Sequence, residues 1–206
     1  MSDKLCLGVN RSIRGRKWTY RHNPETLETY AAEADLPLLQ AALLSGRDVK
    51  PEAIPTFLSP SLKNSLPNPS DLMDADKAAK IILDYIADGK RITLFSDYDV
   101  DGGTSAAQLI RWGRAIEYNF GLYVPDRVKE GYGPSEAAFD QLKSESVDLV
   151  VTLDCGAAAN HALNHADKIG LPVIVIDHHL MDHAPPPALA LVNPNREDDI
   201  LSLIHI

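Results

Sequence analysis

The chain carries the stretch RITLFSDYDVDG at residues 91–102, in which a short apolar run ends in a cluster of acidic side chains. The run is β-branched and continuous rather than alternating, which is typical of a strand buried in a parallel sheet. Gly102 and Gly103 allow a sharp turn, after which we predict a helix capped by Thr104 or Ser105. The acidic side chains are those of Asp97, Asp99 and Asp101.

Two later apolar runs end in the same way. Residues 148–153, DLVVTL, lead into Asp154, and residues 172–176, PVIVI, lead into the tripeptide Asp-His-His at 177–179. Ligands gather at the carboxyl ends of the strands in an open parallel sheet. Carboxylates that meet there repel one another unless cations lie between them. The pattern therefore predicts a divalent-metal site.

The order of the predicted elements indicates an α/β fold. Short connections between alternating strands and helices favour a mostly parallel sheet with helices on both faces. We predict helices over 104–117, 134–145 and 157–169 and strands over 91–96, 120–125, 148–153, 172–177 and 188–192.

We expect three parts along the chain. The first holds an arm, a helical pattern over 24–50 that ends at Gly46, and a proline-rich connector. The second begins with a helix that starts at Asp71 and is closed by Gly89. The parts are an amino-terminal extension at 1–70, an α/β domain at 71–200 and an atypical tail at 201–206.

Basic side chains in the arm surround Trp18 and Tyr20. Two interpretations remain open: an arm that contacts phosphates and stacks on bases, or a solvated tail with one aromatic anchor. The basic residues are Arg11, Arg14, Arg16, Lys17 and Arg21.

Composition narrows the class of protein. The apolar share of 45% and the charged share of 24% are ordinary for a globular protein. The net charge of -9 argues against a general polyanion-coating protein, but a nucleic-acid substrate stays possible if metals neutralise the site. No apolar stretch is long enough to span a membrane. The distant Cys6 and Cys155 form no disulfide framework, which suits the cytoplasm.

Further residues are candidates for substrate binding. Arg127 follows another strand and could hold a phosphate, while Tyr132 lies between glycines and could stack on a base or shape its loop. The predicted helix start at Gly103 and Thr104 would offer N–H groups to a phosphate.

Other polar residues are assigned no function. His161 and His165 share a helix face, but no third ligand is evident and that helix runs away from the metal site. His183 lies in a proline-rich loop, and we expect it at the surface. Cys155 is expected to be a small buried thiol.

Taken together, these motifs resemble the DHH phosphoesterase superfamily and, within it, the RecJ family of bacterial single-strand-specific exonucleases. The resemblance covers roughly residues 18–198 and is specific, because a tyrosine–arginine–glycine block separates this family from smaller DHH enzymes. The matching segments are 97–102, 123–133, 151–156, 177–179 and 192–195.

The resemblance implies hydrolysis of single-stranded DNA from the 5′ end, in recombination and repair, with two Mn²⁺ or Mg²⁺ ions as cofactors. Single-strand-binding protein and a helicase are the further partners it suggests. It also implies roles for the acidic and histidine residues. Asp99 and Asp101 would bind one metal each, Asp154 would bridge them, His178 would complete the second site, Asp97 and Asp177 would support the ligands, and His179 would face the substrate phosphate.

Two departures from the family pattern stand out. Many relatives have a histidine where this chain has Phe95, so we expect one metal to be held less tightly. The pattern also continues beyond residue 206, with a further aspartate ligand and a second, substrate-binding domain. We therefore expect the catalytic amino-terminal half of such an enzyme, weakly active or inactive alone, whose tail reflects a truncated or frameshifted reading frame.

Two alternatives differ in what they bind. One is a DHH phosphodiesterase that acts on short oligonucleotides or cyclic dinucleotides. The other is a non-catalytic DNA-binding or replication scaffold, against which the intact set of predicted ligands argues.

Overall fold

The structure is a computed structural model that describes residues 4–61, 63, 66, 68–181 and 184–199. The chain divides into two compact units, with the boundary after Leu66. The predictions for His183 and for the tail at 201–206 lie outside the described residues.

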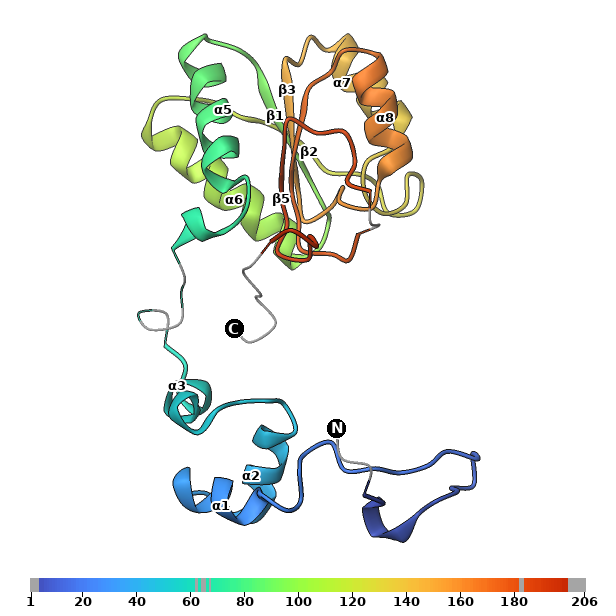
Figure 1. The fold of residues 1–206 in the computed structure, drawn as a ribbon. Coiled ribbons are helices and arrows are strands. Elements are labelled where there is room, and N and C mark those ends of the chain that lie inside the picture. Colours follow the sequence, from blue (N-terminus) through green and yellow to red (C-terminus); the bar gives the residue numbers. More distant parts are fainter. Residues whose placement is uncertain (1–3, 62, 64–65, 67, 182–183, 200–206) are drawn as a thin grey trace. The chain divides into compact units, whose positions relative to one another are not determined.

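The second unit is built on a five-stranded sheet in which every pair of neighbouring strands is parallel (Figure 1). The strand order is β2-β1-β3-β4-β5. The first strand therefore lies inside the sheet, with β2 on one side of it and β3, β4 and β5 following in order on the other. The predicted α/β class with a parallel sheet is confirmed. The strands are shorter than predicted, and β2 has half its predicted length: β1 Ile92–Ser96, β2 Gly121–Tyr123, β3 Leu149–Leu153, β4 Val173–Ile176 and β5 Ala190–Val192.

Helices cover both faces of this sheet, as predicted. Helices α5 (Ala75–Ala87) and α6 (Val100–Ala115) lie on one face, and α7 (Glu136–Ser144) and α8 (Asn160–Lys168) lie on the other (Figure 1). Each face has its own apolar core, because residues of the strands point alternately to the two sides. Among the described helices, none has the length and apolar character needed to cross a membrane.

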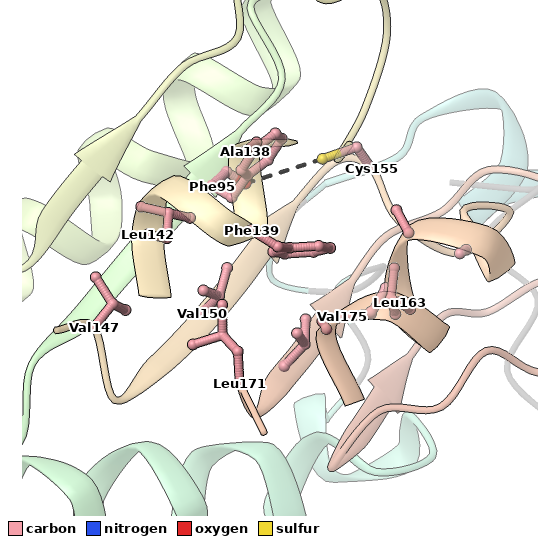
Figure 2. Packing of buried hydrophobic residues seen from close by; sticks show 14 of the residues in the cluster. Phe95, Ala138, Phe139, Leu142, Val147, Val150, Cys155, Leu163, Leu171 and Val175 are labelled. Carbon is pink, nitrogen blue, oxygen red and sulfur yellow. Dashed lines mark hydrogen bonds between the residues drawn. The ribbon is translucent and has the colours of Figure 1, made fainter. Parts of the chain in front are cut away.

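The core beneath α7 and α8 contains Phe95, the residue of β1 for which the family resemblance led us to expect a more weakly held metal. Its ring is fully buried and stacks on Tyr123 at a centroid distance of 5.1 Å. The ring of Phe139 lies in the same core, at a centroid distance of 6.4 Å from Phe95 (Figure 2). The Cys155 thiol is buried in the same core and donates to the Phe95 carbonyl, so the predicted small buried thiol is confirmed. Phe95 therefore contributes packing and no ligand atom.

The start of α6 differs from the prediction. The helix begins at Val100, and its cap is Asp99, whose Oδ1 accepts the N–H groups of Asp101 and Gly102 at 3.0 Å each. Thr104 is already inside the helix and donates its hydroxyl to the Val100 carbonyl. An aspartate is a strong cap because it satisfies N–H groups that no earlier helical carbonyl can reach.

The first unit contains two helices where the sequence predicted one. Helix α1 (Leu27–Glu33) and helix α2 (Leu38–Ser45) are separated at Asp35, whose φ is +51°, and at Pro37. Proline disfavours helical backbone in the residue before it, which explains the break. Gly46 follows α2, as predicted.

The connector also contains short helical segments. A 3-10 turn at Pro51–Ala53 leads into α3 (Ile54–Leu58), and a second at Pro69–Asp71 precedes α5. The helix predicted to start at Asp71 begins at Ala75 instead, because Asp74 has a left-handed backbone. Gly89 closes α5 with a φ of +64°, as predicted.

We expect Gly102→Ala to destabilise the fold by about 1–3 kcal/mol, because a Cβ there would lie 2.4 Å from the backbone carbonyl oxygen of Asp97. Gly103→Ala is the matched control: a Cβ on this adjacent helical residue meets nothing within 4 Å. The control should be neutral or more stable by up to about 1 kcal/mol, because alanine favours helix. Urea unfolding measures both, and equal stability of the two variants would contradict the close approach.

Candidate metal centre

Backbone hydrogen bonds place the three strand-end aspartates along one edge of the sheet, the edge formed by the carboxyl ends of the strands. Asp97 donates its N–H to the carbonyl of Leu153 (3.1 Å), and Asp154 donates to that of Ile176 (2.9 Å). Asp177 donates its N–H to the carbonyl of Val192 in β5 (3.0 Å). Each aspartate thus extends the ladder of its strand by one residue, which fixes its backbone before any side chain is considered.

Asp154 lies at the centre of this edge. Its backbone is left-handed, with φ at +61°, a conformation that costs a non-glycine residue about 1 kcal/mol or more. Its side chain is buried, and neither carboxylate oxygen accepts a hydrogen bond. Burial, together with the charge of Asp99, raises the pKa of Asp154 to about 6.

Asp154 belongs to two groups of potential ligands. In the first, oxygens of Asp97, Asp99 and Asp154 all lie within 4.8 Å of one another. In the second, Asp154 combines within the same limit with the Asp-His-His tripeptide 177–179. Asp154 is the residue that these two groups have in common.

The carboxylate of Asp177 is held by the backbone around it. It accepts N–H groups from Ala157 (2.9 Å), His178 (2.7 Å) and His179 (3.1 Å). Burial raises the pKa of Asp177, but these hydrogen bonds outweigh that effect and lower it overall. A carboxylate so fully bonded is suited to orienting its neighbours.

The two adjacent histidines have different surroundings. His178 Nδ1 lies 3.1 Å from Asp154 Oδ1, whereas His179 Nδ1 lies 2.8 Å from Asp177 Oδ1. Burial lowers the pKa of His179, but the bond to Asp177 and its charge raise it overall. His178 lines a cleft of about 350 Å³, and His179 lines a second cavity of about 450 Å³.

The structure brings Tyr132 to the centre and places Arg127 on the loop beside it. The Tyr132 hydroxyl donates to the backbone carbonyl of Asp154 (3.1 Å) and lies 3.0 Å from His179 Nδ1. Burial raises the pKa of Tyr132, so its hydroxyl keeps its proton. The Arg127 guanidinium lies 5.2 Å from the ring centroid of Tyr98, within the first acidic motif.

Some predicted site residues lie outside the two ligand groups. Asp101 is exposed, but with Thr104 it lines the 350 Å³ cleft that also contains Asp154. The N–H of Gly103 is bonded to the Asp99 carbonyl at 3.0 Å, and the two preceding N–H groups are bonded to the Asp99 carboxylate. The helix start is therefore occupied by Asp99 rather than open to a phosphate.

His161 and His165 face helix α7. His165 Nε2 lies 2.8 Å from Asp140, and the Nδ1 atoms of His161 and His165 lie 3.3 and 3.7 Å from Glu136. These contacts join α7 to α8 and do not include the acidic residues at the sheet edge.

Sequence reasoning missed two asparagines that hold the histidine backbone. Asn193 is fully buried and donates its side-chain amide to the carbonyl of His179 (2.9 Å), while Asn195 donates to the carbonyl of His178. Asn193 Oδ1 in turn accepts the N–H of Asn195 (2.8 Å). The available signal was the Asn-Pro-Asn sequence at 193–195, directly after a strand and within the matching segment 192–195.

The residues at this edge fit divalent cations. Within the described part of the chain, the buried side-chain atoms without a hydrogen bond are Asp97 Oδ1 and both carboxylate oxygens of Asp154. Leaving such atoms unsatisfied is costly, and a cation would satisfy them. Carboxylate oxygens with an added imidazole suit Mn²⁺ or Mg²⁺ better than a soft metal.

Comparison with known proteins identifies one family. Residues 91–202 match the family model described as the DHH family, N-terminal domain. The chain is 38% identical over 175 residues to the single-stranded-DNA-specific exonuclease RecJ of Salmonella typhimurium and 36% identical over the same length to that of Escherichia coli. Each match covers 84% of this chain and 30% of the relative, so the chain spans under a third of these proteins.

Solved structures agree with the sequence matches. A crystal structure of exonuclease RecJ bound to manganese is 35% identical with a TM-score of 0.57, and covers 63% of this chain and 33% of that one. RecJ from Thermus thermophilus in complex with Mn²⁺ is 26% identical with a TM-score of 0.61, and covers 87% of this chain and 25% of that one.

We expect Asn193→Ala to weaken Mn²⁺ binding by roughly 10- to 100-fold, because the His179 carbonyl loses its donor and the ligand-bearing backbone loosens. The stability should also fall by about 1–3 kcal/mol. Asn68→Ala is the control. The Asn68 side-chain oxygen accepts the N–H of Ser70, as that of Asn193 accepts the N–H of Asn195, but it lies outside the site. Titration calorimetry measures the affinity, and a folded Asn193→Ala chain with unchanged affinity would show that the asparagine is not needed.

Proposed function

This chain belongs to the DHH family, and we propose that it is the amino-terminal catalytic part of a metal-dependent exonuclease specific for single-stranded DNA. The observation that carries the proposal is the position of Asp154. It is buried, its oxygens accept no hydrogen bond, and it is common to both ligand groups. The similarity to RecJ enzymes, two of them with manganese bound in crystal structures, supports the same assignment.

In this proposal, two Mn²⁺ or Mg²⁺ ions bind at the sheet edge. Asp154 would be shared between them, Asp97 and Asp99 would contribute to one site, and His178 would contribute to the other. The structure favours Asp97 over Asp101 as a close ligand, since Asp101 lies outside both ligand groups. When bound, such a pair of cations polarises the phosphate and lowers the pKa of a water between them.

The remaining residues would position the substrate. His179 and Tyr132 line the same 450 Å³ cavity and contact each other, so they form one wall on which a phosphate can be oriented. Asp177 restrains the His179 ring and so limits its motion during the reaction. Arg127 supplies a cation near the first acidic motif and can hold a second phosphate.

The biological setting is part of the same proposal. By analogy with the RecJ relatives, digestion would proceed from the 5′ end, in recombination and repair. Single-strand-binding protein and a helicase would then be natural partners, because they generate or cover the substrate. A cytoplasmic location fits this role and the two free cysteines.

We expect Asp154→Asn to lower Mn²⁺ affinity by more than about 100-fold, since loss of a supporting residue alone typically costs 10- to 100-fold. Hydrolysis of single-stranded DNA should fall with it. Calorimetry measures metal binding, and single-turnover assays with excess protein detect even slow cleavage.

Asp167→Asn is the matched control, because it makes the same chemical change at an exposed carboxylate on α8. It should leave both metal binding and cleavage unchanged. If Asp154→Asn reduces neither metal binding nor cleavage, or if the chain binds DNA but no Mn²⁺, the proposal is wrong and a non-catalytic scaffold is favoured.

The substrate class separates the proposal from the alternative phosphodiesterase. Because the chain alone should be weakly active, cleavage is followed with excess protein and Mn²⁺, and we expect it to shorten long single strands stepwise and to leave duplex DNA of the same sequence largely intact. Gel analysis of end-labelled strands makes the comparison. Turnover confined to dinucleotides, cyclic dinucleotides or fragments of up to about five nucleotides would instead support an oligonucleotide phosphodiesterase.

A further inference from the structure

The amino-terminal arm is an ordered loop closed by backbone hydrogen bonds. Leu5 and Thr19 form an antiparallel bridge, and the N–H of Cys6 donates to the carbonyl of Trp18 at 2.9 Å. The tip is also closed, since the N–H of Ser12 donates to the carbonyl of Arg16 (2.9 Å). We call residues 4–21 the basic loop; its geometry differs from that of a solvated tail.

The charge of the basic loop is opposite to that of the chain. The whole protein has a net charge of -9, yet the loop contains no aspartate or glutamate. Four cations are concentrated at its tip, on exposed side chains. Across the described residues, no carboxylate is ion-paired with any of these four, which are Arg11, Arg14, Arg16 and Lys17.

Unpaired cations on a short closed loop favour an anionic partner from outside the unit. Arginines that served only the stability of the fold would be expected to meet the carboxylates that are abundant elsewhere in this acidic chain. Several cations close together along one backbone loop suit a partner that carries many negative charges, such as a phosphodiester chain.

An aromatic side chain lies beside these cations. The ring of Trp18 is half exposed, with 49% of its surface accessible, and the backbone of Trp18 is fixed by hydrogen bonds to both Cys6 and Val9. An exposed indole on a fixed backbone, next to basic residues, is the combination on which unpaired bases stack. Duplex DNA offers no free base face at such a site.

We propose that the basic loop is an accessory binding site for single-stranded DNA, separate from the metal centre. Arg11, Arg14, Arg16 and Lys17 contact successive phosphates, and Trp18 stacks on a base. The choice of DNA rests on the proposed function, whereas the charge and the exposed indole belong to the loop itself.

The test measures binding without hydrolysis. A fluorescein-labelled oligothymidylate of about 30 nucleotides is titrated in EDTA, and anisotropy is recorded from about 50 to 200 mM salt. The variant R11Q/R14Q/R16Q/K17Q should reduce the salt slope of log K by about 3, since each phosphate contact on single strands contributes about 0.7. The control K77Q/R111Q/R114Q/K168Q removes the same charge from exposed positions of the second unit. It should change the affinity and the salt slope little.

The indole gives a second, spectroscopic measurement. The chain has two tryptophans, so Trp112→Phe leaves Trp18 as the only indole, whose fluorescence is excited selectively over that of the tyrosines. Oligothymidylate should quench its fluorescence, and Trp18→Ala should weaken binding by about tenfold while Trp18→Phe retains most of it.

Three results would overturn the proposal: equal loss of affinity in the control variant, unchanged Trp18 emission at saturating DNA, or equal affinity for duplex DNA. Binding to anionic phosphatidylserine vesicles without binding to the oligonucleotide would also overturn it, in favour of a membrane surface. The proposed function is contradicted by a different result. A chain that binds DNA through the loop but neither binds Mn²⁺ nor cleaves DNA would refute the nuclease function and leave the accessory binding site supported.

Discussion

The candidate site depends on the hydrogen-bond ladder of the parallel sheet, continued one residue beyond the strands. Asp97, Asp154 and Asp177 each donate a backbone N–H to the neighbouring strand, so their side chains meet at one edge. Because the sheet is buried on both faces, this edge is also where the backbone leaves the core. Carboxylates are thereby brought together in partly dry surroundings, where their mutual repulsion is strong and a counter-charge is most valuable.

Asp99 links this electrostatic arrangement to the fold. Its Oδ1 caps α6, which stabilises both the helix start and the ionised carboxylate, and the hydrogen bond from Gly102 lowers the pKa of Asp99. The absence of a side chain at Gly102 lets that helix approach Asp97 closely. One aspartate therefore orients a helix and belongs to a ligand group, so local folding and cation binding would favour the same geometry.

Much of this was predictable from the sequence. Continuous β-branched runs followed by acids identified β1, β3 and β4, and parallel-sheet geometry then required Asp97, Asp154 and the tripeptide 177–179 to converge. The cap of α6 was not predictable, because aspartates at 97, 99 and 101 and a threonine at 104 are all good caps. The asparagine contacts were not predictable either, since Asn193 reaches the histidine backbone only after β5 has paired with β4.

The two adjacent histidines show how much the supporting contacts matter. Asp177 and Tyr132 restrain the ring of His179, while His178 is turned toward Asp154 and a different cavity. Asn193 and Asn195 hold the backbone carbonyls of both residues, so the backbone of neither histidine can shift without breaking a bond outside the tripeptide. Identical side chains thus acquire different chemistry from their neighbours. A substitution that leaves both histidines in place can still disable the site if it releases the segment that follows β5.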